Sequence, residues 1–254
     1  MVLLWHRLIS RNAESYPRHP EAAVALNDIK PMLTVLFRAL GGDPGVDLAP
    51  AGQQTSHHRL KWRQKLGLAE EHLPAATLGE ASLHLPEKLD VFPEAAHNRD
   101  LYVWLAAFFS TVPVPDTTAP DDALVHDLRA LWTAYHATRR ALTAYPGLRA
   151  RHDRLAARLL ATRPGRRDHL PPTEAAVEAV VRHLLGDDGA PDERAWAILA
   201  AVTADRAPTA SPVPPPRRYR PFLPVPLWGA VADAVTRSPP PEAEEDDDEA
   251  TEPA

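Results

Sequence analysis

The sequence contains no cysteine among its 254 residues. Disulfides, thiolate metal sites, iron–sulfur clusters and cysteine nucleophiles are therefore excluded. Glycine is scarce, at 11 residues, and none of the glycine motifs GxxxxGK[ST], GxGxxG or GxSxG occurs. No apolar run approaches the length of a membrane span, and the first ten residues lack the features of a signal peptide. These absences predict a cytoplasmic protein without membrane insertion.

Basic charge is also too thinly distributed for nucleic-acid binding. The clusters RPGRR at residues 163–167 and RRYR at residues 217–220 are too small for the footprint of a nucleic-acid-binding protein. Acidic charge is concentrated instead, because residues 242–254 hold eight acidic side chains and no basic one. Without those eight charges the net charge changes from −6 to +2. We therefore expect no nucleic-acid partner, and a disordered acidic tail over residues 238–254.

Helical periodicity dominates the rest of the chain, whereas strand-like alternation is nearly absent. The 28 prolines indicate short elements joined by stiff connections. We therefore predict an all-α fold: an irregular multi-helix domain at residues 1–207, a Pro-rich linker at 208–237 and the acidic tail. Within the linker, the apolar segment 219–231 (YRPFLPVPLWGAV) is expected to dock on the helical domain or on a partner.

Apolar residues at helical spacing mark seven segments, at residues 31–42, 56–67, 98–112, 121–147, 155–160, 173–186 and 192–202. In the first segment, Pro31 is expected in the opening turn and Gly41 after the end. Its expected core stripe is Met32, Val35, Leu36, Ala39 and Leu40. Thr173 and Asp192 are placed to cap the last two helices. The six tryptophans are spread about one per element, which favours core packing over a stacking platform.

The segment HNRDLYVWLAAFF at residues 97–109 raises the question of catalysis. One interpretation of HNRD is an acid/base cluster at the mouth of a helix. The other is structural: Asn98 caps the helix and Asp100 adds negative charge to its first turn. The apolar face that follows contains Leu101, Trp104, Leu105, Phe108 and Phe109. Because capping explains Asn98 and Asp100 without chemistry, we favour the structural interpretation, which leaves an exposed Arg99 as a possible partner contact.

Twelve histidines invite a metal or catalytic interpretation, but their spacing does not support one. No HExxH motif occurs, and the adjacent His57 and His58 point to different sides of a helix. His126 and His136 are ten residues apart, which is too far for a shared ion. We expect no metal and no cofactor.

Three stretches carry a resemblance to a known family. They are WHRLISRNAESYP with LFRALGG (residues 5–17 and 36–42), LPEKLDVFPEAAHNRDLYVWLAAF (85–108) and FLPVPLWGAV (222–231). In this order they resemble the amino-terminal region of the NorD/CbbO family, large cytoplasmic proteins associated with activation of nitric oxide reductase or of rubisco. The resemblance implies a partnership with a MoxR-type AAA+ ATPase ring that remodels or matures a target enzyme.

Members of this family usually end in a von Willebrand factor type A domain with a DxSxS metal site. No DxSxS pattern occurs in this sequence, so we expect that domain to be missing or to be a separate chain. No metal-binding role is carried over to any residue here.

The sequence thus predicts a non-catalytic adaptor module that acts with a MoxR-type AAA+ ATPase on a target metabolic enzyme. The alternative is a helical scaffold or protein-interaction module of unrelated purpose. A third hypothesis is a histidine-dependent hydrolase, which is supported only by the number of histidines. The candidate partner-binding residues are Arg99, Phe222, Leu227 and Trp228.

Overall fold

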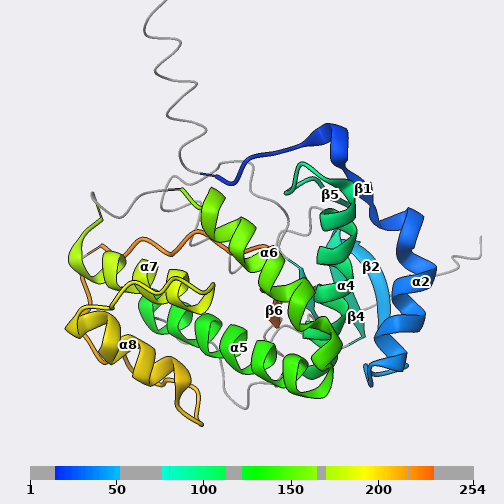
Figure 1. Cartoon of the computed structure of the whole chain (residues 1–254). Coiled ribbons are helices and arrows are strands. Elements are labelled where there is room, and N and C mark those ends of the chain that lie inside the picture. The colour runs from blue at the N-terminus through cyan, green and yellow to red at the C-terminus, as the bar shows by residue number, and fades with distance from the viewer. Residues whose placement is uncertain are drawn as a thin grey trace, which may run out of the picture.

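The computed structural model describes residues 15–51, 76–79, 81–112, 122–164, 170–216 and 218–231. The expected helix at 56–67, His57, His58 and the acidic tail lie outside these ranges. Within them the chain is mainly helical, with two small sheets beside the helices (Figure 1). The α-helices are α2 (Leu26–Ala39), α4 (Ala95–Thr111), α5 (Ala123–Ala144), α6 (Arg149–Thr162), α7 (Pro172–Leu184) and α8 (Glu193–Thr203). Two short 3-10 turns, η1 (Pro20–Ala22) and η2 (Pro146–Leu148), precede α2 and α6.

Helix α4 is the centre of the fold. It packs against α2, α5 and α6, whereas α8 packs against α5 and α7. All five residues of its expected apolar face are buried, which confirms the prediction for this helix. Tyr102 and Ala106 are buried as well. Helix α4 is therefore covered on more than one side, as expected of a core helix.

The expectation of an all-α fold is wrong in one respect, because the described chain contains two small sheets. In one, β2 (Asp47–Ala51) runs parallel to β4 (Ser82–Pro86), which pairs with β3 (Thr77–Leu78), and β3 pairs with β6 (Ala230–Val231). The other pairs β1 (Val24–Ala25) with β5 (Lys88–Leu89), antiparallel. In β4, Leu83 and Leu85 are fully buried. Their alternation with Ser82 and His84 is too short to stand out in the sequence, and the pairing joins distant segments.

Helix α2 forms as expected but buries a different face. It begins at Leu26, so Pro31 lies inside the helix and not in its first turn. Met32 and Val35, from the expected core stripe, are 44% and 69% exposed. The buried residues are Leu26, Ile29, Leu33 and Phe37. The helix carries two apolar stripes, and the one with the larger side chains faces the core. Gly41 follows the helix with φ of 78°, which confirms the expected glycine at its end.

Asn98 does not cap α4, contrary to the prediction. The helix begins at Ala95, with Glu94 as the N-cap residue. Asn98 lies inside the helix, fully buried, where its Nδ2 donates to the carbonyl oxygens of Ala22 (2.8 Å) and Phe92 (2.9 Å). Its Oδ1 accepts from the Phe92 amide at 3.0 Å. The side chain therefore joins η1 and the turn before α4 to the helix, because buried backbone groups need hydrogen-bond partners.

The other predicted helix ends gave mixed results. Asp192 caps α8, where its Oδ1 accepts from the Ala195 amide at 2.8 Å, and Gly186 follows α7 with φ of 96°, both as predicted. Thr173 is not a cap, because α7 already begins at Pro172. Proline has no amide hydrogen and is therefore suited to the first helical position.

Candidate partner-binding surface

The four predicted partner-contact residues lie in different environments. Arg99 is exposed on α4, and Phe222 and Trp228 are half-buried in the C-terminal segment, defined here as residues 218–231. Leu227 is fully buried. Its side chain is part of the core in this structure and is not available at the surface, whereas the prediction of Arg99, Phe222 and Trp228 as partner contacts stays a prediction.

The end of the C-terminal segment packs against α4. The indole Nε1 of Trp104 donates to the carbonyl oxygen of Leu227 at 3.0 Å. The Ala230 amide donates to the carbonyl oxygen of Ala76 at 2.9 Å, which places β6 at the edge of the sheet. Gly229 lies so close to α4 that an added Cβ would stand 1.8 Å from Cζ of Phe109. A glycine is needed here for close approach and not for an unusual backbone angle.

A buried carboxylate on α5 holds the start of the same segment. Asp127 accepts hydrogen bonds from the hydroxyl of Tyr219 at 2.8 Å and from the amide of Phe222 at 2.9 Å. Burial and the neighbouring Asp127 raise the pKa of Tyr219 well above its ordinary value. The phenol therefore stays protonated and acts as a donor to the carboxylate.

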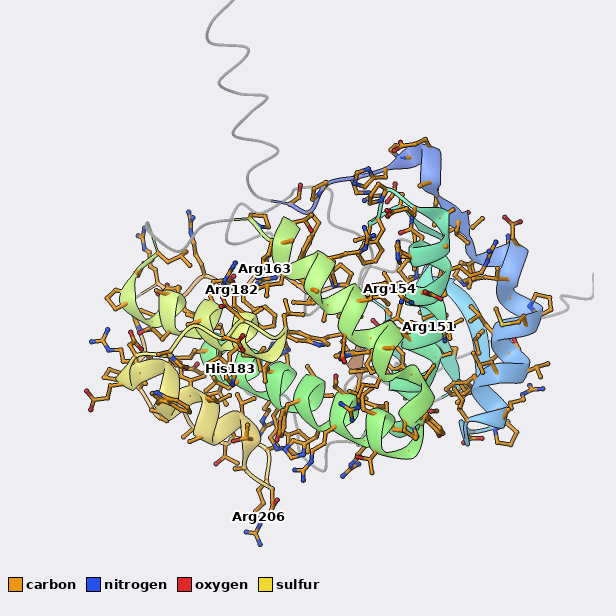
Figure 2. All side chains as sticks on the ribbon, viewed as in Figure 1. Arg151, Arg154, Arg163, Arg182, His183 and Arg206 are labelled. Atoms are coloured by element: carbon orange, nitrogen blue, oxygen red, sulfur yellow. The ribbon has the colours of Figure 1, made fainter. Side chains whose placement is uncertain are left out.

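Arg163, which is labelled in Figure 2, joins three parts of the chain through its hydrogen bonds. Its guanidinium donates to both carboxylate oxygens of Glu178 on α7, at 2.6 and 2.8 Å. It also donates to the hydroxyl of Tyr16 at 2.8 Å and to the carbonyl oxygen of Leu223 at 3.1 Å. Burial alone would lower the pKa of Arg163, but the contacts with Glu178 and Tyr16 raise it overall. Arg163, the first residue of the small basic cluster at 163–167, is therefore buried and paired within the fold.

The HNRD residues have structural partners. His97 lies 3.0 Å from a carboxylate oxygen of Glu94, and Asp100 binds Arg151 of α6 at 2.8 Å. Asn98 satisfies the backbone as described above. These contacts support the structural interpretation of the segment and leave Arg99 as its exposed member.

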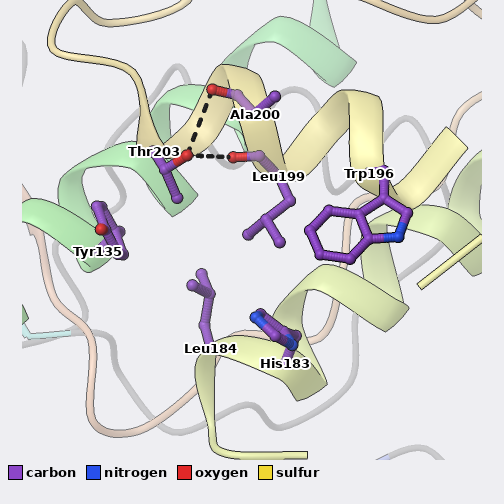
Figure 3. Close-up of a pocket in the computed structure, with 7 residues that line it drawn as sticks. All are labelled: Tyr135, His183, Leu184, Trp196, Leu199, Ala200 and Thr203. Atoms are coloured by element: carbon purple, nitrogen blue, oxygen red, sulfur yellow. Dashed lines mark hydrogen bonds between the residues drawn. The ribbon is translucent and has the colours of Figure 1, made fainter. Parts of the chain in front are cut away.

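A pocket of about 390 Å³ lies between α5, α7 and α8 (Figure 3). Trp196 stands at its edge and is 54% exposed, so the prediction that this tryptophan packs in the core is wrong. Across from it lies His183, with ring centroids 6.5 Å apart. The Nδ1 atom of His183 is buried and has no hydrogen-bond partner within the described part of the chain. The full lining is Tyr135, His183, Leu184, Trp196, Leu199, Ala200 and Thr203.

The pocket is lined mainly by apolar side chains and has an exposed tryptophan at its edge. Exposed tryptophans are enriched where one protein binds another, and concave apolar surfaces with a few polar atoms favour ligand or side-chain binding. The hydroxyl of Thr203 donates to the carbonyl oxygens of Leu199 at 2.9 Å and Ala200 at 3.4 Å, so it is already occupied within α8 (Figure 3). The sequence gave no signal for this pocket, because Trp196 shares the spacing of core residues.

Within the described ranges, no three His, Asp or Glu side chains are arranged to hold a metal ion. In the same part of the chain, the helices are too short or too polar to cross a bilayer.

Comparison with known proteins gives a consistent match. Over 224 residues, or 88% of this chain, the sequence is 42% identical to Protein NorD of Brucella abortus (strain 2308), covering 33% of that protein. Protein NorD of Stutzerimonas stutzeri is 33% identical over 73% of this chain and 28% of its own length. An uncharacterized protein of Pseudomonas aeruginosa is 36% identical, with the same coverage. No family model and no solved structure matches. The chain spans about a third of the length of the curated relatives it matches.

Proposed function

Because this chain belongs to the NorD family, we propose that it is a non-catalytic adaptor module acting with a MoxR-type AAA+ ATPase. In this role it supports the activation or maturation of a target enzyme of the nitric oxide reductase or rubisco type. The ATPase hydrolyses ATP, and the adaptor binds both the ring and the target. The observation that carries the proposal is the 42% identity to NorD over 88% of the chain.

The surface of the helical fold supports a role in protein binding. Trp196 at the pocket edge, and Met32 and Val35 on the outer face of α2, are the large apolar side chains that the described structure exposes. Exposed tryptophan in a pocket is a frequent anchor of protein interfaces. We therefore assign the pocket as the first surface to test for contact with the ATPase. The same features suit an interaction module of unrelated purpose, which is the second candidate.

Measurements of ATP hydrolysis distinguish the two candidates. A MoxR-type ATPase is purified after co-expression with this chain, and its rate is measured while the chain is titrated in. We expect the two proteins to co-purify and the rate to change with a saturable dependence on the chain. If the two proteins do not co-purify and the rate of ATP hydrolysis does not change, the adaptor role is contradicted. The interaction module of unrelated purpose is then the better explanation.

Two variants localise the contact. Trp196→Ala removes the exposed indole, so it should raise the concentration of chain needed for half of the effect. Arg194→Ala is the matched control, because Arg194 is an exposed residue of the same helix outside the pocket lining. If both variants need the same concentration of chain for half of the effect, the pocket is not part of the interface with the ATPase. The adaptor role proposed from the NorD relatives would not be affected by this result.

A further inference from the structure

Helix α6 carries a row of three arginines that are paired with only two carboxylates. We call Arg151, Arg154 and Arg158 the α6 ridge. Arg151 and Arg154 share the single carboxylate of Asp100 on α4, at 2.8 and 3.4 Å. Arg158 binds Glu94 at 3.1 Å, and Glu94 also binds His97. All three guanidinium groups are partly exposed, and Figure 2 shows Arg151 and Arg154 along α6.

Further arginines extend the positive surface. Arg99 on α4 and Arg149 at the start of α6 are exposed, as are Arg139 and Arg140 near the end of α5. The one carboxylate of α6, Asp153, lies 3.0 Å from His152. The surface around the ridge is therefore net positive, although the chain as a whole is net negative, at −6.

The compensating charge lies in one run of the same chain. Residues 242–249 contain seven acidic side chains and no basic one. The described chain reaches Val231, and the ten residues 232–241 separate it from this run. Ten residues span at most about 33 Å.

The C-terminal segment lies close to the helix that carries the ridge. Trp104 donates to the carbonyl oxygen of Leu227, and its ring lies 4.4 Å from the ring of His152, centroid to centroid. His152 is the direct neighbour of Arg151 on α6. Leu227 and α6 therefore contact the same buried ring, that of Trp104. Residues 232–241 have to pass over the surface to bring the acidic run to the ridge, and their span of about 33 Å is available for this path.

We propose that the acidic run 242–249 binds the α6 ridge of its own chain. Carboxylates of the run supply additional partners for Arg151, Arg154 and Arg158, which have only Asp100 and Glu94 between them. Single exposed ion pairs are weak, but a tether raises the effective concentration of the run to about the millimolar range. The contact is electrostatic, so salt weakens it. It is a property of the chain alone and does not depend on the proposed ATPase partnership.

The absence of cysteine makes a direct distance measurement possible. Ala157→Cys on α6, which is exposed beside the ridge, and Ala250→Cys next to the acidic run provide two sites for donor and acceptor dyes. We expect high energy transfer at low salt and a lower value at about 1 M salt, where the screening length is about 3 Å. Transfer that is insensitive to salt overturns the proposal. Transfer that appears between separately labelled chains overturns the intramolecular contact.

Matched charge variants test the location. The triple variant R151Q/R154Q/R158Q should lower the transfer to the high-salt value. The control R38Q/R194Q/R206Q removes the same charge from exposed arginines on or beside α2 and α8, and should leave the transfer unchanged. An equal fall in both triple variants indicates a general charge effect and overturns the proposal.

A third variant covers the case in which the ridge variant fails to fold, which circular dichroism will detect. Asp246→Asn, Asp247→Asn and Asp248→Asn together neutralise part of the acidic run outside the described fold. This variant should reduce the transfer at low salt as well. Unchanged transfer in the folded tail variant overturns the proposal.

Discussion

The indole Nε1 of Trp104 lies 3.0 Å from the carbonyl oxygen of Leu227, although the two residues are 123 positions apart in the sequence. Both side chains are fully buried. The C-terminal segment therefore completes the core around α4, in addition to being held by Asp127 and Arg163. A substitution of Trp104 or of Leu227 should therefore destabilise the packing between the C-terminal segment and α4, including at residues distant in the sequence.

Trp104→Phe tests the hydrogen bond separately from the packing. Phenylalanine retains most of the apolar contact but leaves the buried Leu227 carbonyl without its donor, which costs about 1–3 kcal/mol. Trp104→Ala also creates a cavity, and should cost about 3–5 kcal/mol. Chemical denaturation measures both values. Hydrogen exchange of the Trp228 and Ala230 amides, which donate to Val225 and Ala76, should become faster in both variants. Equal stability of the wild type and Trp104→Phe would show that this hydrogen bond does not stabilise the fold.

Gly229→Ala should destabilise the protein through overpacking. The added methyl group would stand 1.8 Å from Cζ of Phe109, so the segment or the ring must move, at a cost of about 1–3 kcal/mol or more. Gly147→Ala is the control, because no atom lies within 4 Å of its added Cβ, and it should be near neutral. The smaller side chain of Phe109→Leu should reduce the penalty of Gly229→Ala in a double-mutant cycle. Additive effects would argue against a direct clash.

Local signals predicted much of the helical part of the fold. Asp192, Gly41 and Gly186 mark helix ends because capping and left-handed glycines depend on neighbouring residues alone. The apolar spacing around Trp104 and Leu105 also identified the central helix. These features need no knowledge of the rest of the chain.

The features that the sequence did not reveal depend on contacts between distant segments. Helix α2 has two apolar stripes, and its packing against α4, β1 and β2 decides which of them is buried. Trp196 has the spacing of a core residue but faces a pocket. The burial of Arg163 was not apparent from the sequence, because its partners Tyr16 and Glu178 are 147 and 15 positions away. Charge and spacing alone cannot identify such pairings.

Asn98→Ala should cost more than the loss of a helix cap. A cap is worth about 0.5–2 kcal/mol. Here the substitution removes three buried hydrogen bonds and leaves backbone groups of Ala22 and Phe92 without their partner, so we expect a loss on the order of 3 kcal/mol or more. Urea denaturation measures the loss, and Arg99→Ala, an exposed neighbour, serves as the control. A loss below about 1 kcal/mol would indicate that water replaces these contacts.

His152 should make the fold sensitive to mild acid. Burial against Trp104 lowers the pKa of His152 below its ordinary value, although the neighbouring Asp153 opposes this shift. Below about pH 6.5 the unfolded chain therefore binds a proton that the folded chain excludes, and the free energy of unfolding falls as the pH falls. His152→Phe keeps an aromatic ring beside Trp104 without a titrating group, so the loss of stability between about pH 7 and pH 5 should be smaller than in the wild type. Asp153→Asn removes the group that raises the pKa of His152, so the loss should become larger. Urea denaturation of the three proteins across this range measures the slopes. Parallel slopes in all three would show that His152 is not the titrating group, because the two substitutions are expected to change the slope in opposite directions.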